Sequence, residues 1–132
     1  MKAEFAVLNI LLNTTAVTDI AGTRVYLDEA PQTDPYPLVI VSEEDVEPGP
    51  TKSGVSAVDY DIIRVYPYAA SKETLRLLAA ACRAALDGKA AGTYNSVAIE
   101  FIRYQGQTSF DETIVNRKVY AKDQQYNVRV NL

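Results

Sequence analysis

Histidine is absent from the 132-residue sequence, and cysteine occurs once, at Cys82. Without histidine the chain lacks the commonest general base and metal ligand, and every Ser-His or Cys-His catalytic arrangement is excluded. One cysteine excludes an internal disulfide and a cysteine-based zinc site, and is typical of a reducing compartment. Neither GxxxxGK[ST] nor GxGxxG occurs, so no phosphate-binding loop is recognisable. We therefore expect no cofactor and no metal.

Long apolar runs and an excess of basic residues are also missing. No run reaches the length of a membrane-spanning helix, and the start, MKAEFAVLNILLN, has no convincing small-residue cleavage site. We therefore expect a mature protein made in the cytoplasm, with no membrane partner. Lys and Arg number 13 against 17 Asp and Glu, a net charge of −4, which argues against tight sequence-independent DNA binding. The length predicts one domain, residues 1–132, with a real core.

Two main helices are predicted from apolar residues at helical spacing, one over residues 3–13 and one that begins after Ser71. Ser71 is a good N-cap, Glu73 suits the helix dipole, and Gly88 ends the second helix. A short helical turn, AVTDIA, separates the first helix from the strands. The apolar stripe of the main helix comprises Leu75, Leu78, Ala79, Cys82, Ala85 and Leu86. Cys82 is therefore expected to be a small core residue.

The segment RVYLDEAPQTDPYPLVIV, residues 24–41, joins a short strand to a much more hydrophobic one. The β-branched run at its end lacks alternation, which suggests a strand buried on both faces. Pro31, Pro35 and Pro37 exclude a helix here and remove three backbone donors, so the connection is stiff. It either fixes the entry of a core strand or sets how the domain meets its neighbours.

Alternating patterns predict further strands over residues 55–68, over residues 97–104 and at the end of the chain. Residues 43–54 and 105–113 (QGQTSFDET) read as polar loops. The acidic first loop is either a solvated hairpin excursion or a protruding segment that meets a partner in an assembly. The element order is helix, strand, strand, strand, helix, strand, strand. This order predicts an α+β fold, an antiparallel sheet with two main helices packed on one face.

One candidate site for chemistry remains. Asp59 and Asp61 are expected side by side on one strand face, where they either hold a divalent cation, act as acid and base, or are solvated acids at an exposed strand end. Nine tyrosines and no tryptophan add a weak signal, because tyrosine is favoured at protein–protein contacts but is also common in strands.

Several of these patterns together resemble the phage tail-completion, or tail-terminator, family of small head-to-tail joining proteins. The matching stretches are the helix ending in LLN, VTDIAGTRVYLDEAPQ, YPLVIVS, YDIIRVYPYAASKETLRLLAAACRAALDG and the terminal alternating strand. The resemblance covers nearly the whole chain. Its most specific part is RVY…APQ…YPLVIVS, followed after a Gly/Pro loop by a strand and a helix closing in ALDG.

The resemblance implies an α+β subunit of a six-membered ring that caps the tail tube, stops its growth and faces the head connector. It implies no catalytic residue, and its partners would be other copies of the chain, the tail tube protein and a head-completion protein. Genomic DNA would only pass through the lumen. The chain would assemble in the host cytoplasm and remain at the head-proximal end of the tail in the virion. The residues to which this assigns contacts are Glu43, Glu44, Asp45, Glu47, Tyr36, Tyr60, Arg64 and Arg129.

Within this interpretation, an acidic loop facing the lumen would repel DNA and let it slide. Arginines on strands, including Arg24, would pair with acids across a ring interface, and the neighbours would bury exposed strand edges.

Three alternatives stay open: another head-completion role, a small-molecule-binding regulatory module, and an enzyme that uses the Asp59 and Asp61 pair with a metal.

Overall fold

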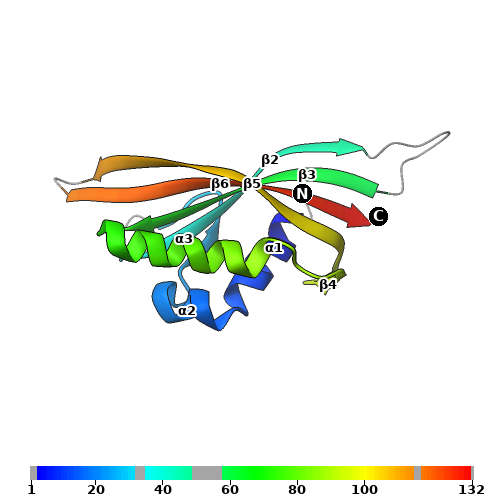
Figure 1. Cartoon of the computed structure of the whole chain (residues 1–132), viewed down its shortest axis with the longest axis horizontal. Helices are drawn as coiled ribbons and strands as arrows, with labels where there is room; N and C mark the ends of the chain where they lie inside the picture. Colours follow the sequence, from blue (N-terminus) through cyan, green and yellow to red (C-terminus); the bar gives the residue numbers. More distant parts are fainter. Residues whose placement is uncertain (1–2, 32–34, 49–57, 115–116, 132) are drawn as a thin grey trace.

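The computed structural model describes residues 3–31, 35–48, 58–114 and 117–131. These residues form three helices and six strands (Figure 1). In chain order the elements are α1 (Ala3–Leu12), α2 (Thr15–Ala21), β1 (Val25–Leu27), β2 (Leu38–Pro48), β3 (Val58–Ala69), α3 (Lys72–Leu86), β4 (Gly92–Tyr94), β5 (Val97–Ile114) and β6 (Arg117–Asn131). The predicted α+β class and the order of the main elements are confirmed.

The strands form one sheet in the order β1-β2-β3-β6-β5-β4. Every pairing is antiparallel except that of β1 with β2, which is parallel, so the sheet is mixed. The proline-containing connection lies between the two parallel strands in the sequence. β4 lies within residues 88–96, which the sequence pattern assigned to a loop, and it pairs with only three residues of β5.

The helices lie together on one face of the sheet, here called the inner face, and leave the other, outer face without a helix (Figure 1). The core fills the space between the helices and the inner face. From the sheet it takes Val41, Ile63 and Val65, and from the helices Leu11 and Leu78, all 0% exposed. Burying one such side chain contributes about 1.5–3 kcal/mol.

α3 forms where the sequence pattern predicts it. The Ser71 hydroxyl accepts a hydrogen bond from the backbone N–H of Thr74 at 3.2 Å, which caps the first turn. The apolar stripe faces the core and Cys82 on it is buried, as predicted. The helix ends at Leu86, and Gly88 then adopts a φ of 72°, a conformation that glycine adopts without strain.

Two segments that the sequence pattern assigned to loops are strands. Residues 43–48 belong to β2 and pair with β3, and residues 105–113 belong to β5 and pair with β6. Residues 49–57, the remainder of the first expected loop and the start of the strand expected over 55–68, lie outside the described residues. The β2–β3 pair and the β5–β6 hairpin extend past the helices in opposite directions (Figure 1). The helices reach only the near part of each extension, where the start of α1 covers Asp61 and the first turns of α3 face the β5–β6 hairpin. The distal parts therefore form by backbone pairing, without the apolar alternation that marks a half-buried strand.

A buried polar network links β6 to α3. The Nε2 group of Gln124, a residue that is 0% exposed, donates to the carbonyl oxygen of Ala79 at 3.0 Å and to Oε1 of Gln107 at 3.2 Å. The hydroxyl of buried Tyr126 donates to Oε1 of Gln124 at 2.9 Å. The network satisfies the buried amide, which would otherwise destabilise the core.

No helix in the described ranges has both the length and the apolar character needed to cross a membrane.

Candidate interaction surface

Both edges of the sheet carry long stretches of strand without a neighbour among the described residues. β1 pairs with β2 only at residues 39–41, so residues 44–48 of β2 form one edge without a paired strand among the described residues. β4 pairs with β5 only at residues 97–99, and beyond it the carbonyl of Ile102 accepts from the N–H of Gly88 and the N–H of Tyr104 donates to Oδ1 of Asp87, so residues 105–114 of β5 form the other. Near the start of this second edge, Gly106 adopts a φ of 140° beside a register shift. Unpaired N–H and C=O groups on such edges favour pairing with another chain.

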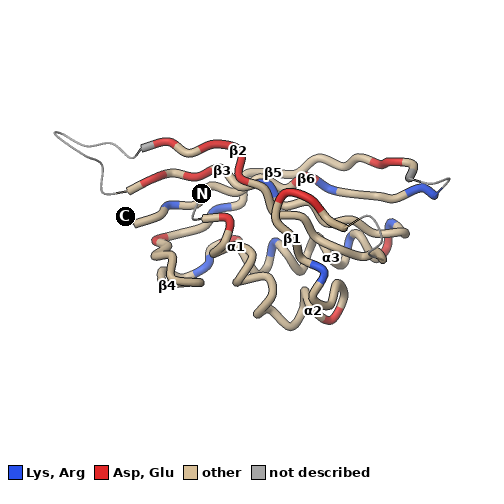
Figure 2. The backbone as a smooth tube through the Cα atoms, turned by 180° about the vertical axis from the view of Figure 1, so that it is seen from behind, with Lys and Arg blue, Asp and Glu red and all other residues tan. Residues whose placement is uncertain are grey.

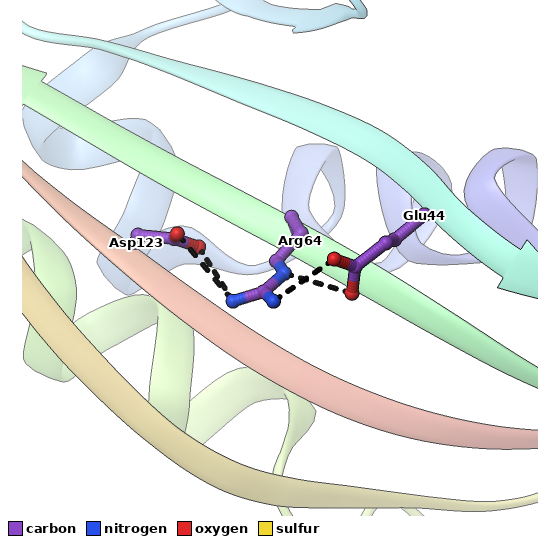
Figure 3. A network of polar contacts seen from close by, with 3 residues as sticks. All are labelled: Glu44, Arg64 and Asp123. Carbon is purple, nitrogen blue, oxygen red and sulfur yellow. Dashed lines mark hydrogen bonds and ion pairs between the residues drawn. The ribbon is translucent and has the colours of Figure 1, made fainter.

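The middle of the outer face holds an ion-pair network across three strands. Arg64 on β3 forms a two-pronged contact with Glu44 on β2, from Nη2 to Oε1 at 3.0 Å and from Nε to Oε2 at 3.1 Å. Its Nη1 lies 3.3 Å from Oδ1 of Asp123 on β6 (Figure 3). The hydrogen bond to Glu44 is the main cause of a raised pKa of Arg64. The network therefore links the three neighbouring strands β2, β3 and β6 through side chains on the outer face.

One end of the outer face carries aromatic rings stacked with arginines. The rings of Tyr60 and Phe101 lie 6.5 Å apart, and the guanidinium of Arg129 lies 5.5 Å from the Tyr60 ring. Arg129 Nε contacts Oε2 of Glu100 at 2.8 Å. Arg103 covers the Phe101 ring at 4.3 Å. Aromatic and arginine side chains of this kind are enriched at protein interfaces.

The opposite end of the outer face carries a second aromatic cluster. The ring of Phe110 contacts Tyr68 edge-on at 5.9 Å and Tyr66 at 6.4 Å, and Tyr36 lies 6.4 Å from Tyr68. Tyr68 is half-buried, and this burial raises the pKa of its hydroxyl to about 12. Three apolar residues of the facing strands are buried in this region, Leu38, Val119 and Ala121. The cluster is thus a small apolar centre on the helix-free side of the sheet.

The acidic residues of the β2–β3 extension have different surroundings. Asp61 is only 3% exposed, and burial raises its pKa to about 6, with the carboxylates of Glu43 and Asp59 adding to the rise. The backbone N–H of Ala3 in α1 forms a hydrogen bond with Asp61, which acts in the opposite direction and lowers this pKa. The expectation of a solvated Asp61 at an exposed strand end is therefore wrong, because the start of α1 covers that position. Asp59 is half-buried on the same face.

The other predicted contact residues are spread over both ends of the sheet. Tyr36, Tyr60, Arg64 and Arg129 contribute to the outer-face contacts described above. Glu44 pairs with Arg64, whereas Asp45 and Glu47 are exposed on β2. Glu43 is half-buried, and Arg24 donates from Nε to the carbonyl of Pro37 at 2.9 Å within its own chain.

Sequence reasoning missed Phe101, Phe110 and Asp123, all of which contribute to the outer face. Phe110 lay in an expected loop, and nothing local places Asp123 beside Arg64. The one signal in the sequence for a continuous strand was that Phe101 and Phe110 flank a polar stretch without proline. Within the described ranges, no group of three or more Cys, Asp or Glu side chains has the arrangement of a metal site.

A pocket of about 330 Å³ opens between the first turns of α3 and the β5–β6 hairpin. Lys72, Arg76 and Lys122 line it, together with the ring of Tyr120. Asp111 is the acid in its wall, and Nζ of Lys118 lies 3.6 Å from this carboxylate. The pocket therefore presents an excess of positive charge.

Comparison with known proteins adds an independent observation. The family model described as tail completion protein gp17 matches residues 6–129. A chain of the virion of a native gene transfer agent particle has the same fold, with a TM-score of 0.71 at 24% identity over 96% of this chain and 92% of that chain. A second solved structure has a TM-score of 0.56 at 12% identity over 92% of this chain and 89% of its own. No curated protein sequence matches the chain.

Proposed function

The chain belongs to the family of tail completion protein gp17, whose members are structural proteins of the phage tail, and we propose that it caps the head-proximal end of a tail tube. In this role it stops polymerisation of the tube and forms part of the head-tail joining interface. Its partners are the tail tube protein and a head connector or head-completion protein. The related fold in a gene transfer agent virion supports this proposal, since that chain is also part of a phage-like particle.

The observation that carries the proposal is the pair of free edges on opposite sides of one sheet. Residues 44–48 and 105–114 belong to different strands, so contact between the two edges joins one patch to a different patch. Such heterologous contacts generate a ring when the rotation closes. We propose a ring of six copies, the number that the resemblance implies, through which genomic DNA passes. The net charge of −4 on each copy makes the ring acidic and limits attachment of the passing DNA.

The proposed function needs no catalytic residue and no cofactor. Assembly takes place in the host cytoplasm, and the chain stays in the virion at the end of the tail nearest the head. The two aromatic clusters of the outer face are candidate contacts with the tube or the connector, since aromatic side chains that a partner buries often carry most of the energy of an interface.

The function is tested by removing the gene from a particle-producing strain and imaging the particles by electron microscopy. We expect tail tubes of uncontrolled, excessive length and heads without tails, and a wild-type copy should restore both. Tails of normal length attached to heads would contradict the proposal.

Native mass spectrometry of the free protein over a concentration series, with and without magnesium, then tests the ring. A hexamer is expected to grow with concentration. A small molecule retained at one per chain would instead favour the regulatory module. Turnover dependent on magnesium and lost in Asp59→Asn would favour the enzyme.

A further inference from the structure

One end of the sheet is acidic. We call residues 43–48 of β2 and 58–61 of β3 the acidic arm; among them are six carboxylates and neither lysine nor arginine. Figure 2 shows the carboxylates concentrated at this end, on β2 and β3. Glu44 is already paired with Arg64, and Asp61 is buried. Asp45 and Glu47 are exposed and have no ion pair with any residue that the structure describes.

The other end carries the complementary charge. We call the pocket between α3 and the β5–β6 hairpin the cationic pocket. Lys72 and Arg76 are exposed on the first two turns of α3, and Lys122 is half-buried on β6. Nζ of Lys72 lies 5.5 Å from the centre of the Tyr120 ring in the pocket wall. None of the three cations forms an ion pair within the described ranges, so their charge is available to another molecule.

The acidic arm lies at one end of the sheet, and the β5–β6 hairpin, which lines the cationic pocket, extends from the opposite end, so one copy cannot bring arm and pocket together (Figure 2). Two copies can do so, with the arm of each in the pocket of the next, and the contact repeats from copy to copy. The arm is a two-stranded segment with carboxylates on an extended backbone, and the pocket is open beside a sheet edge. Facing charges of opposite sign favour this orientation over the reverse one, in which like charges meet.

We propose that the acidic arm of one copy docks in the cationic pocket of the next copy, through Asp45 and Glu47 on the arm and Lys72 and Arg76 in the pocket. This inference rests on the proposed ring, and it names the contact that sets the direction of assembly. It also gives the acids of the arm a role between subunits, where the resemblance places them at the lumen.

A charge-swap experiment tests the contact. The arm variant is Asp45→Lys with Glu47→Lys, and the pocket variant is Lys72→Glu with Arg76→Glu. All four positions are exposed, and acids at the start of α3 suit its helix dipole, so both variants should fold. Circular dichroism checks the fold.

A control variant, Asp19→Lys with Glu29→Lys, makes the same change of charge at exposed positions outside the arm. Ring formation is measured by native mass spectrometry of each full-length chain. It is measured again in particles from a strain that carries the variant.

Each variant alone should lower the ring population about tenfold or more, because like charges then face each other at every contact. The control should match wild type. An equimolar mixture of the arm and pocket variants should restore rings in which the two chains alternate, since each reversed surface then meets its complement. Combining all four substitutions in one chain should also restore rings.

Rings of wild-type abundance in either variant, or no restoration in the mixture, would overturn the inference and leave the proposed function standing. Normal rings with failed DNA delivery in the arm variant would overturn it in favour of the lumen role. Normal rings in the pocket variant, with loss of binding to a short DNA duplex, would identify the pocket as a phosphate site instead. Wild-type protein that forms rings neither free nor in particles would overturn the proposed ring itself.

Discussion

The hydroxyl of Tyr126 donates a hydrogen bond to Oε1 of Gln124, two residues earlier on the same face of β6, at 2.9 Å. Neither side chain is exposed to solvent. The amide group of Gln124 also reaches the carbonyl of Ala79, so the pair fixes α3 against the sheet. Because α3 forms one wall of the cationic pocket, this buried contact helps to define the shape of the proposed interface.

Tyr126→Phe should lower the free energy of unfolding by about 1–2 kcal/mol, because it leaves the buried carbonyl oxygen of Gln124 without a donor. Urea denaturation at neutral pH measures the change. Tyr66→Phe is the matched control, since its hydroxyl has no hydrogen-bond partner among the described residues. Equal losses in the two variants would show that the contact with Gln124 contributes nothing specific.

Cys82 should be inert in the folded protein. Its side chain is 0% exposed, and burial raises the pKa of the thiol to about 12, so almost no thiolate exists at pH 8. A chromogenic disulfide reagent should therefore react only after the chain opens, at a rate that rises steeply with urea. Cys82→Ala should give no signal at any urea concentration. Fast reaction of the native protein would contradict the placement of Cys82 in the core.

The carboxyl group of Asp61 should make stability depend on pH. Its folded-state pKa of about 6 lies above the ordinary value of 3.8, so the folded chain binds more protons than the unfolded chain between these pH values. The free energy of unfolding should therefore fall as the pH rises through this window, by about 2–3 kcal/mol. Asp61→Asn should be more stable than wild type at pH 7.5 by a similar amount and should match it near pH 4.

Urea denaturation from pH 4 to pH 8 follows this dependence. Burial also raises the pKa of Glu4, so a smaller slope should remain in Asp61→Asn. Asp59→Asn, two residues away on the same strand, is the control and should keep most of the wild-type slope. A slope that is the same in wild type and Asp61→Asn would contradict the assignment.

The periodicity of apolar residues predicted the structure correctly wherever one face of a helix or strand packs against the core. Ser71 and Gly88 bound α3 because capping chemistry is local, and the alternation through Tyr126, Val128 and Val130 matches a strand whose inner face is buried. The long strands β2 and β5 were underestimated for the same reason. Their distal halves extend beyond the helices, so their polar residues carry no signal of burial.

Contacts that depend on register could not be predicted from local patterns. Arg64 meets Asp123 only because β3 pairs with β6 in one register, and the two residues are 59 positions apart in the chain. Asp61 was expected to be solvated, since no nearby residue indicates that the start of α1 covers it. The resemblance identified the family and named candidate contact residues, but it gave no partner side chain for any of them. The outer-face clusters therefore emerged only from the structure.

Arg64→Lys should lower the free energy of unfolding by about 0.5–1 kcal/mol, because lysine keeps the charge but cannot make the two-pronged contact with Glu44. The side chains of Arg64 and Glu44 are 26% and 46% exposed, so water screens the pair and the effect stays small. Arg117→Lys, an exposed position without an ion pair in the described ranges, is the control and should change little. The difference between the two variants should shrink in 1 M salt. A loss that persists there would indicate lost packing as the cause.

The aromatic cluster around Phe110 should determine how rigid the β5–β6 hairpin is. Phe110→Ala removes edge-on contacts with Tyr66 and Tyr68 and should lower the free energy of unfolding by about 2 kcal/mol. Amide hydrogen exchange in residues 117–121, which pair with this part of β5, should become faster.

Phe101→Ala makes the same change at the other end of β5 and should leave exchange in residues 117–121 as in wild type. Phe110 also lines the cationic pocket, so a hairpin loosened at this position should weaken ring formation in addition. Faster exchange at the hairpin in both variants would show that the sheet loosens as a whole. In that case the cluster would not hold the pocket wall in place, and the effect of Phe110→Ala on assembly would follow from global stability alone.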